Sequence, residues 1–223
     1  MLVVLKDNKD ILTNLKNEKP VIIYKNFIGE ENCNEVRKYS HNFTKKNLPK
    51  IGNRFKETFW RLDVLPSKVK TNRIFRTICF NDERIENFPK VFFEIFNNMK
   101  KFQNKYLNLQ QNINSDFKRR PQIIHYPVGG GFFDWHNHKR FPNNYGLILN
   151  LSKKKREFNF GQTEIKLDDN QILKVDDHAD IGDLILFRYD LPHRVAPCDP
   201  EKDLEFSANG RWTAVLPILN EAE

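Results

Sequence analysis

Three side chains that can bind a metal ion follow one another at two-residue steps near the middle of the chain. They are Asp134, His136 and His138, within the stretch YPVGGGFFDWHNHKR at residues 126–140. Residues i, i+2 and i+4 of an extended strand project from one face. The three glycines at 129–131 give this stretch a flexible or tightly turned entry. The spacing therefore predicts a strand that presents up to three metal ligands on one face.

A further candidate ligand, His193, lies much later in the chain, after an apolar stretch at 184–189 and an Asp-Leu-Pro turn. Two histidines and a carboxylate on one face form the ligand set that holds Fe(II) in non-heme oxygenases and leaves other coordination positions open. Imidazole also suits Zn(II) and Cu(II). The spacing alone therefore does not choose the metal.

An anion receptor is predicted near the end of the chain, in the segment GRWTAVLPI. Arg211 and Thr213 are two residues apart, so on a strand they project to the same side, opposite Trp212 and Ala214. A guanidinium beside a hydroxyl can bind a carboxylate through a bidentate ion pair and one hydrogen bond. Inside an apolar barrel such a pair would be costly unless an anion filled it.

The elements that must position these residues differ between the two halves of the chain. Apolar residues recur at three- and four-residue steps from Phe88 to Tyr106, which predicts a helix, and a second helix is predicted at 30–41. Short strands separated by turn-forming residues are expected at 3–5, 21–24, 122–126, 145–151, 162–167, 172–175, 183–189 and 211–218. Many short strands at close spacing indicate a mainly β sandwich, jelly roll or barrel with supporting helices.

Length and composition narrow the class of protein. The 223 residues fit a single domain, in which we expect residues 1–120 to supply N-terminal strands and helices and residues 121–218 to form the core. No apolar run is long enough to span a membrane, and the N-terminus lacks the features of a signal peptide. Three scattered cysteines form no CxxC pair and favour a reduced, cytoplasmic setting.

The chain carries a net charge of +8. A polyanionic partner such as nucleic acid is one interpretation, but the lysines are spread through the chain, and the densest run, KKKR at 153–156, reads as a loop. A solvated basic surface is the interpretation we favour, with attraction of small anions as a weaker alternative.

Several motifs occur in an order that resembles the Fe(II)/2-oxoglutarate-dependent dioxygenases. The matching residues are Tyr126, Gly131, the HxH step of His136 and His138, GDLILF at 182–187, HRVAP at 193–197 and GRWT at 210–213. The resemblance covers roughly residues 121–218 and is greatest to the phytanoyl-CoA dioxygenase and prolyl hydroxylase-like branches. It implies a double-stranded β-helix, a jelly-roll and cupin-like core with helices on one side. It also implies bound Fe(II), 2-oxoglutarate as co-substrate and O2.

Residue roles are carried over on the matching positions. His136 matches the first histidine ligand, His193 the distal one, and Arg211 with Thr213 the pair that meets the far carboxylate of 2-oxoglutarate. Tyr126 and Asn150 could also reach the co-substrate. Trp135 and Arg140 flank the metal face and could contact the primary substrate.

One departure from the family pattern concerns the metal. Where the family has Asp or Glu, this chain has His138. Three histidines could hold the iron, Asp134 could supply the carboxylate in reversed order or orient an imidazole, or His136 and His193 could bind alone. We favour three histidines, because His138 occupies the matching position.

We therefore predict an oxygenase that oxidises a C–H bond of a small molecule and releases succinate and CO2. A peptidyl or prolyl hydroxylase and a nucleic-acid demethylase are alternatives within the superfamily. A cupin-like module that binds metal or sugar without catalysis is an alternative from another class. A Zn(II) hydrolase does not account for Arg211 and Thr213.

Overall fold

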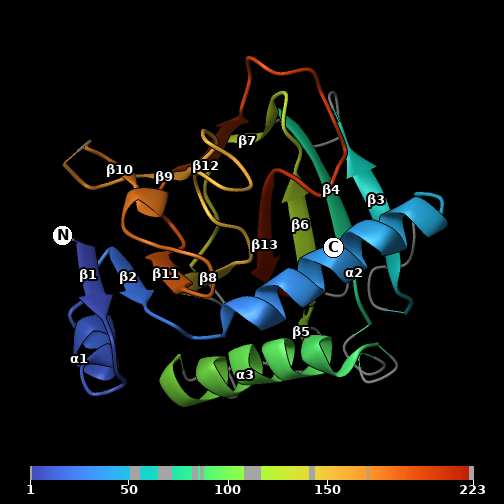
Figure 1. Ribbon diagram of the computed structural model, residues 1–223. Coiled ribbons are helices and arrows are strands. Elements are labelled where there is room, and N and C mark those ends of the chain that lie inside the picture. Colours follow the sequence, from blue (N-terminus) through green and yellow to red (C-terminus); the bar gives the residue numbers. More distant parts are fainter. Residues whose placement is uncertain are drawn as a thin grey trace.

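The computed structural model describes residues 2–50, 56–64, 72–81, 85, 88–107, 117–140, 144–169 and 171–220. These residues form three α-helices, one 3-10 helix and fourteen strands (Figure 1). In chain order they are β1 (Leu2–Leu5), α1 (Ile11–Lys16), β2 (Val21–Tyr24), α2 (Glu30–Lys46), β3 (Phe59–Asp63), β4 (Arg73–Cys79), α3 (Lys90–Tyr106), β5 (Phe117–Arg119), β6 (Gln122–Tyr126), β7 (Gly131–His136), β8 (Tyr145–Asn150), β9 (Thr163–Lys166), β10 (Ile172–Lys174), η3 (Val175–Asp177), β11 (Leu184–Arg188), β12 (His193–Cys198), β13 (Arg211–Val215) and β14 (Ile218–Asn220).

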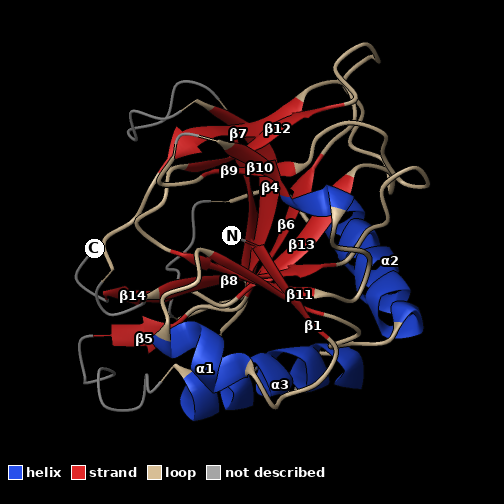
Figure 2. Ribbon diagram, turned by 90° about the vertical axis from the view of Figure 1, so that its left-hand side faces the viewer, coloured by secondary structure: helices blue, strands red, loops and turns tan. Residues whose placement is uncertain are grey.

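Twelve strands join into one curled sheet in the order β1-β2-β11-β8-β13-β6-β4-β7-β12-β9-β10, with β3 paired to β4. Strand β4 is the junction, because it pairs with β6 through Arg76 and with β7 through Arg73. One layer therefore contains β2, β11, β8, β13 and β6, and the other contains β7, β12, β9 and β10. Figure 2 shows these two layers, with the helices beside the first of them.

Helices α2 and α3 cover the outer face of the first layer (Figure 1). Both helices place apolar residues on the sheet side, such as Val36 of α2 and Phe92 of α3, in one large buried cluster with Leu149 and Trp212. Two smaller clusters fill the space between the two layers. Strand β11 shows the division, because Leu186 lies in the helix-side cluster and Phe187 in the interior one.

Most elements agree with the sequence-based expectations. Strands β2 and β6 have the predicted bounds, and the others end within about two residues of them, apart from the last strand, where β13 stops at Val215. The helix predicted at 30–41 continues to Lys46. Helix α3 begins at Lys90 rather than Phe88, because Pro89 has extended ψ and caps it.

Three parts of the sheet were not anticipated. We predicted no strand for either β4 or β12. The region 42–72, for which no strand was predicted either, contains β3, which pairs with β4. Its segments 51–55 and 65–71 lie outside the described residues. Because β4 lies between β6 and β7, the N-terminal half of the chain contributes to the same sheet as residues 121–218.

The class of fold is the predicted one, a mainly β structure with supporting helices. No helix in the described part of the chain is long and apolar enough to cross a bilayer. The three cysteines, Cys33, Cys79 and Cys198, are all buried and unpaired.

Candidate metal and co-substrate site

Three histidines meet at one end of the space between the two layers. His136 ends β7 and His193 begins β12, and the antiparallel register sets these two residues directly opposite each other. Their ring centroids are 4.2 Å apart, and the ring of His138 lies 5.1 Å from His136 and 5.3 Å from His193. One nitrogen from each of the three rings lies within 4.8 Å of the other two.

Hydrogen bonds fix the orientation of two of these rings. The Nδ1 atom of His136 lies 2.7 Å from the backbone carbonyl of Asp134, and that of His193 lies 2.9 Å from the carbonyl of Leu191. A carbonyl can only accept, so each Nδ1 carries the proton and donates it. Each Nε2 therefore keeps its lone pair free for a metal, with the second-partner arrangement typical of metal-bound histidines.

His138 completes the group from the loop that follows β7. Its backbone N–H donates to the carbonyl of Tyr189 at 3.0 Å, and its ring stacks on the Tyr189 ring with centroids 4.4 Å apart. Asp134 is not a member of the group. Its carboxylate accepts the N–H of Trp135 at 2.8 Å, while its backbone carbonyl holds His136.

The three imidazoles are held neutral. Burial, together with the neighbouring His136, lowers the pKa of His193 to about 3. Burial likewise lowers the pKa of His136 and lowers that of His138 to about 4. His138 is exposed as a whole residue, but its ring packs between Tyr189 and His136. Since only the neutral ring binds a metal, the protein does not need to release protons to accept one near neutral pH.

Arg211 is buried in the interior, at a distance from the histidines. Strand β9 connects the two positions, because it contacts both Arg211 and His193. Its side chain is 1% exposed, and its Nη2 donates to the hydroxyl of Thr163 at 2.7 Å and to the amide oxygen of Asn150 at 3.2 Å. Thr163 is two residues before Ile165 on β9, and Ile165 is the register partner of His193. Two residues along a strand span roughly 6.6 Å, so Arg211 contacts the wall about one side-chain level below the histidines.

A buried carboxylate shares this position with Arg211. Asp176, in the 3-10 helix η3, has both oxygens 3.3 Å from Nη2 of Arg211. It also accepts the backbone N–H of Thr163 at 2.7 Å and the side-chain amide of Asn150 at 3.3 Å. Asp176 therefore fixes one edge of the guanidinium and offsets part of its charge.

Two nitrogen atoms of the Arg211 guanidinium have no partner in the described part of the chain. Atoms Nε and Nη1 of Arg211 are buried and have no hydrogen-bond partner among the described residues. A buried N–H group left without an acceptor costs about 1–3 kcal/mol. These two donors point to different sides of the guanidinium, and a carboxylate oxygen would satisfy either of them. The residues present therefore suit the far end of a dicarboxylic co-substrate.

A cavity of about 730 Å³ contains the three histidines and extends into the barrel. Ile124, Tyr126 and Thr163 also line it, and Thr163 accepts a hydrogen bond from Arg211, which does not itself line the cavity. Tyr126 is the register partner of Arg211, and burial raises the pKa of its hydroxyl above the ordinary value, so the phenol stays protonated. Thr213 is buried on β13 between β6 and β8, on the same side as Arg211.

The outer face of the barrel holds the backbone on both sides of Arg211. The N–H of Trp212 donates to the Ser152 hydroxyl at 2.8 Å, and the N–H of Gly210 donates to the carbonyl of Glu157 at 2.9 Å. Gly210 has φ +113°, and an added Cβ would come within 2.4 Å of the Tyr126 carbonyl. Glycine is therefore required where β13 begins.

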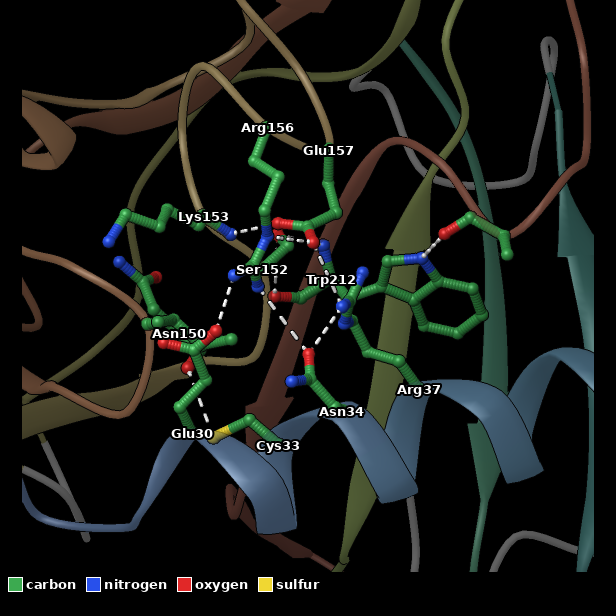
Figure 3. A network of polar contacts seen from close by, with 12 residues as sticks. Glu30, Cys33, Asn34, Arg37, Asn150, Ser152, Lys153, Arg156, Glu157 and Trp212 are labelled. Carbon is green, nitrogen blue, oxygen red and sulfur yellow. Dashed lines mark hydrogen bonds and ion pairs between the residues drawn. The ribbon is translucent and has the colours of Figure 1, made fainter.

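Glu157 links this loop to helix α2 (Figure 3). Its carboxylate accepts the backbone N–H of Lys153 at 2.6 Å, Nη2 of Arg37 at 3.0 Å and Nε of Arg156 at 2.5 Å. Arg156 reaches onward to Glu30 at the start of α2. The network thus ties the helix, the loop after β8 and the start of β13 together.

Two residues considered as substrate contacts lie elsewhere. Arg140 forms an ion pair with Glu18 at 2.7 Å on the surface, and Trp135 lies under the guanidinium of Arg194 at 4.8 Å. Neither lines the cavity that holds the histidines.

The basic run at 153–156 is largely neutralised by ion pairs. Lys153 pairs with Asp180, Lys154 pairs with Asp177, and Arg156 pairs with Glu30 and Glu157. This pairing supports the interpretation of a solvated surface over that of a nucleic-acid contact.

Sequence reasoning missed three residues that contact this site or line its cavity. Asp176 was not singled out, because it follows the strand expected at 172–175 and carries no motif. Thr163 could have been found from the alternation in GQTEIK, where it shares a strand face with Ile165. Arg73 carried no local signal, because β4 itself was not predicted.

Comparisons with known proteins agree with this geometry. No protein-family model matches the sequence, and no curated protein matches it either. Among solved structures, a prolyl-4-hydroxylase of Pseudomonas putida aligns over 94% of this chain and 97% of its own, with a TM-score of 0.64 and 13% identity. An oxidoreductase of the 2OG-Fe(II) oxygenase family from Burkholderia pseudomallei aligns over 99% and 96%, with a TM-score of 0.54 and 11% identity.

A third similar structure is a prolyl hydroxylase of Trichoplax adhaerens in complex with a peptide fragment of the hypoxia inducible factor oxygen degradation domain. It aligns over 96% of this chain and 89% of its own, with a TM-score of 0.54 and 17% identity. At these identities the comparisons show the fold: the chain has the curled β fold of the 2OG-Fe(II) oxygenases and prolyl hydroxylases. The fold predicted from the sequence is therefore confirmed.

Proposed function

We propose that this protein is an Fe(II)- and 2-oxoglutarate-dependent oxygenase that oxidises a C–H bond of a small molecule. The observation that carries the proposal is that two features are joined through one residue, because Thr163 lines the cavity of the histidines and accepts a hydrogen bond from Arg211. Three neutral imidazoles point at a common position, and Arg211 presents two unpartnered buried donors deeper in the same barrel. Neither feature alone would select this reaction, because three histidines also suit other metals.

In this proposal His136, His138 and His193 hold the metal, and Arg211 holds the far carboxylate of 2-oxoglutarate. When bound, the iron and its co-substrate supply the oxidising chemistry, in which O2 converts 2-oxoglutarate to succinate and CO2. The chain's own contribution is orientation. Asp176, Thr163 and Asn150 fix the guanidinium, while Asp134 and Leu191 fix two imidazole rings.

Apolar rings pack against two of the three imidazoles, which favours a dry site. Phe133 stacks on His136 at 3.8 Å, and Phe187 lies 4.6 Å from His193. These rings and Val195 line the cavity beside the histidines. Keeping the site dry strengthens the ion pair at Arg211 and limits side reactions.

A spectroscopic test separates the proposal from its rivals. Anaerobic addition of Fe(II) and then 2-oxoglutarate should give a visible metal-to-ligand charge-transfer band, since the co-substrate chelates iron. A metal-binding module without the co-substrate site would give none. Admission of air should then release succinate, which a Zn(II) enzyme would not form.

A peptidyl or prolyl hydroxylase is the second candidate. It is favoured by the near full-length likeness to the Pseudomonas putida prolyl-4-hydroxylase and by the peptide complex of the Trichoplax adhaerens protein. Proline-containing peptides that increase succinate release and gain 16 Da would support it. The cavity volume lies within the roughly 300–1,000 Å³ typical of small-molecule sites, and we therefore keep a small molecule as the first choice.

A further inference from the structure

The cavity that holds the three histidines has a one-sided charge. Its described lining includes four cationic side chains, Arg61, Arg73, Lys139 and Arg194, and no Asp or Glu. The charge of Arg194 is offset by Glu164 at 2.7 Å, so the other three are the ones that give the cavity its positive charge. Arg211 and its partner Asp176 belong to the deeper co-substrate position and are not counted among them. A cleft lined by one sign of charge concentrates ligands of the opposite sign.

Arg73 is connected to the metal position through Phe133. It begins β4, where its register partner is Phe133 on β7, and its guanidinium lies 5.9 Å from the Phe133 ring centroid. Phe133 in turn stacks on His136 at 3.8 Å. The charge of Arg73 also contributes to lowering the pKa of His136, which agrees with this closeness.

Arg73 has spare hydrogen-bonding capacity. Its Nε atom is buried and has no partner among the described residues, while Nη2 pairs with Asp63 at 3.3 Å. Asp63 is itself 7% exposed and also accepts Nε of Arg61 at 2.9 Å. Two guanidinium groups share one carboxylate, so this corner of the cavity keeps a net charge of about +1.

The surroundings of this corner are apolar. Phe75 stands edge-on to Tyr126 at 5.4 Å, and Phe133 lies 5.3 Å from Phe75. Val195 and Ile124 line the adjacent wall. A guanidinium in such surroundings binds an anion more strongly than it would in water, because the local dielectric constant is low.

We propose that the primary substrate is a small molecule with an apolar body and a carboxylate or phosphate group, and that Arg73, supported by Arg61, binds this anionic end beside the metal position. This proposal rests on the proposed function, because the bound molecule is a substrate only if the protein is an oxygenase. The binding site itself does not depend on turnover.

A pair of fluorescent probes tests the site without metal. 8-Anilinonaphthalene-1-sulfonate is an anion, and N-phenyl-1-naphthylamine is a neutral molecule of similar aromatic body. We expect the metal-free protein to bind the anionic probe at least about tenfold more tightly, the difference that one charge-assisted hydrogen bond provides. Arg73→Gln should remove this preference and leave the affinity for the neutral probe unchanged.

Three further proteins make the result specific. Arg73→Lys keeps the charge and should retain part of the preference, which excludes loss by misfolding. Arg188→Gln removes an arginine that pairs with Asp168 and Asp190 outside the cavity, and should leave both affinities as in wild type. Loss of the anionic preference in Arg211→Gln but not in Arg73→Gln would assign the probe to the co-substrate position and overturn the proposal.

Competition then identifies the anionic group. Displacement of the probe by octanoate but not by octyl phosphate assigns a carboxylate, and the reverse assigns a phosphate. Displacement by octan-1-ol as effectively as by either anion overturns the proposal. If the protein released succinate in the oxygenase assay but bound both probes equally well, the proposed function would stand. Only the proposal of an anionic substrate would be wrong.

Discussion

His136 and His193 stand opposite each other on the paired strands β7 and β12, with ring centroids 4.2 Å apart. Each ring donates its Nδ1–H to a carbonyl of its own segment. Sheet pairing therefore brings the rings together and local backbone turns them toward each other. His138 follows two residues after His136, beyond the end of the strand, so its position depends on the contact with Tyr189 rather than on register.

The third histidine is the most testable part of the metal proposal. We expect His138→Ala to weaken Fe(II) binding by at least about tenfold, since tenfold is already the effect of losing a supporting contact around a ligand. His138→Asp should restore strong binding, because it reinstates the carboxylate of the HxD pattern. Anaerobic titration with Fe(II), followed by the charge-transfer band with 2-oxoglutarate, measures both variants.

Asp134→Asn is the matched control for that experiment. Its carboxylate contacts the Trp135 N–H and no histidine ring, whereas its backbone carbonyl, which orients His136, is retained in the variant. Fe(II) affinity should change little. Undiminished binding in His138→Ala, or strong loss in Asp134→Asn, would contradict the three-histidine site.

Metal affinity should depend little on pH near neutrality. The pKa of His193 is lowered to about 3 by burial, and that of His136 is also lowered. Protons therefore compete with the metal only at pH values well below the ordinary histidine pKa of about 6.5. We expect Zn(II) affinity, measured by competition with a chelator of known pH dependence, to be nearly constant from pH 8 to 6. A tenfold loss per pH unit beginning near pH 6.5 would show that the rings are not shielded.

The same burial makes the metal-free protein sensitive to acid. A histidine whose pKa is lower in the folded than in the unfolded state binds more protons when unfolded. His193 therefore contributes stability that is complete above about pH 6.5 and is lost as pH falls toward 3, by up to about 1.4 kcal/mol per pH unit. Denaturant unfolding with EDTA should show a steeper acid loss in wild type than in His193→Gln. The variant His178→Gln, at an exposed position, should keep the wild-type slope.

The sequence was enough to predict which side chains of a strand face the interior. It did not predict which residues of distant strands they contact there. The alternation of Arg211, Trp212, Thr213 and Ala214 was enough to assign sides, and Trp212 and Ala214 do lie in the helix-side cluster. The HxH step likewise predicted a strand, and β7 extends to His136. Both inferences are local, because strand periodicity needs only neighbouring residues.

The residues that were missed depend on contacts distant in sequence. Asp176 carries no motif in the sequence. Its ion pair with Arg211 is visible only in the folded chain, where η3 lies against that side chain. Strand β4 was not predicted because its two arginines, Arg73 and Arg76, interrupt the expected pattern. Arg76 is nonetheless buried, held by the Nδ1 atom of His125 at 2.8 Å and the Thr44 hydroxyl at 2.8 Å. A sequence without its fold does not show such compensating partners.

Arg211 should govern co-substrate affinity. Replacing it by Gln removes two unpartnered donors and the positive charge that would meet the far carboxylate. Charge-assisted hydrogen bonds contribute about 1.5–3 kcal/mol each, so we expect KM for 2-oxoglutarate to rise by at least about tenfold. Fe(II) binding without co-substrate should be unchanged. An unaltered KM would mean that another cation binds the carboxylate.

Asp176 offers a complementary double-mutant test. Leaving one member of a buried ion pair unpaired costs roughly 3–5 kcal/mol, so Arg211→Gln and Asp176→Asn should each destabilise the protein by a few kcal/mol. The double variant should be more stable than the sum of the single losses predicts, because neither charge remains unpaired. Urea unfolding of the four proteins measures the coupling, and simple additivity would show that the 3.3 Å contact contributes no coupling energy.

Helix α2 should influence co-substrate binding through Glu157, although this residue does not line the cavity that holds the histidines. Glu157 is 9% exposed, and its carboxylate pairs with Arg37 of α2 (Figure 3). Its backbone carbonyl accepts the N–H of Gly210. Glu157→Gln removes the charge that Arg37 needs and should cost about 1–3 kcal/mol of stability. Because β13 begins at Arg211, loosening Gly210 should also raise KM for 2-oxoglutarate by a few fold while Fe(II) affinity stays constant.

Lys153→Gln is the control for this prediction. It keeps the backbone N–H that Glu157 accepts and removes only a surface pair with Asp180, so it should change neither stability nor KM. If Glu157→Gln lowered stability but left KM unchanged, the network would support the fold without positioning the arginine.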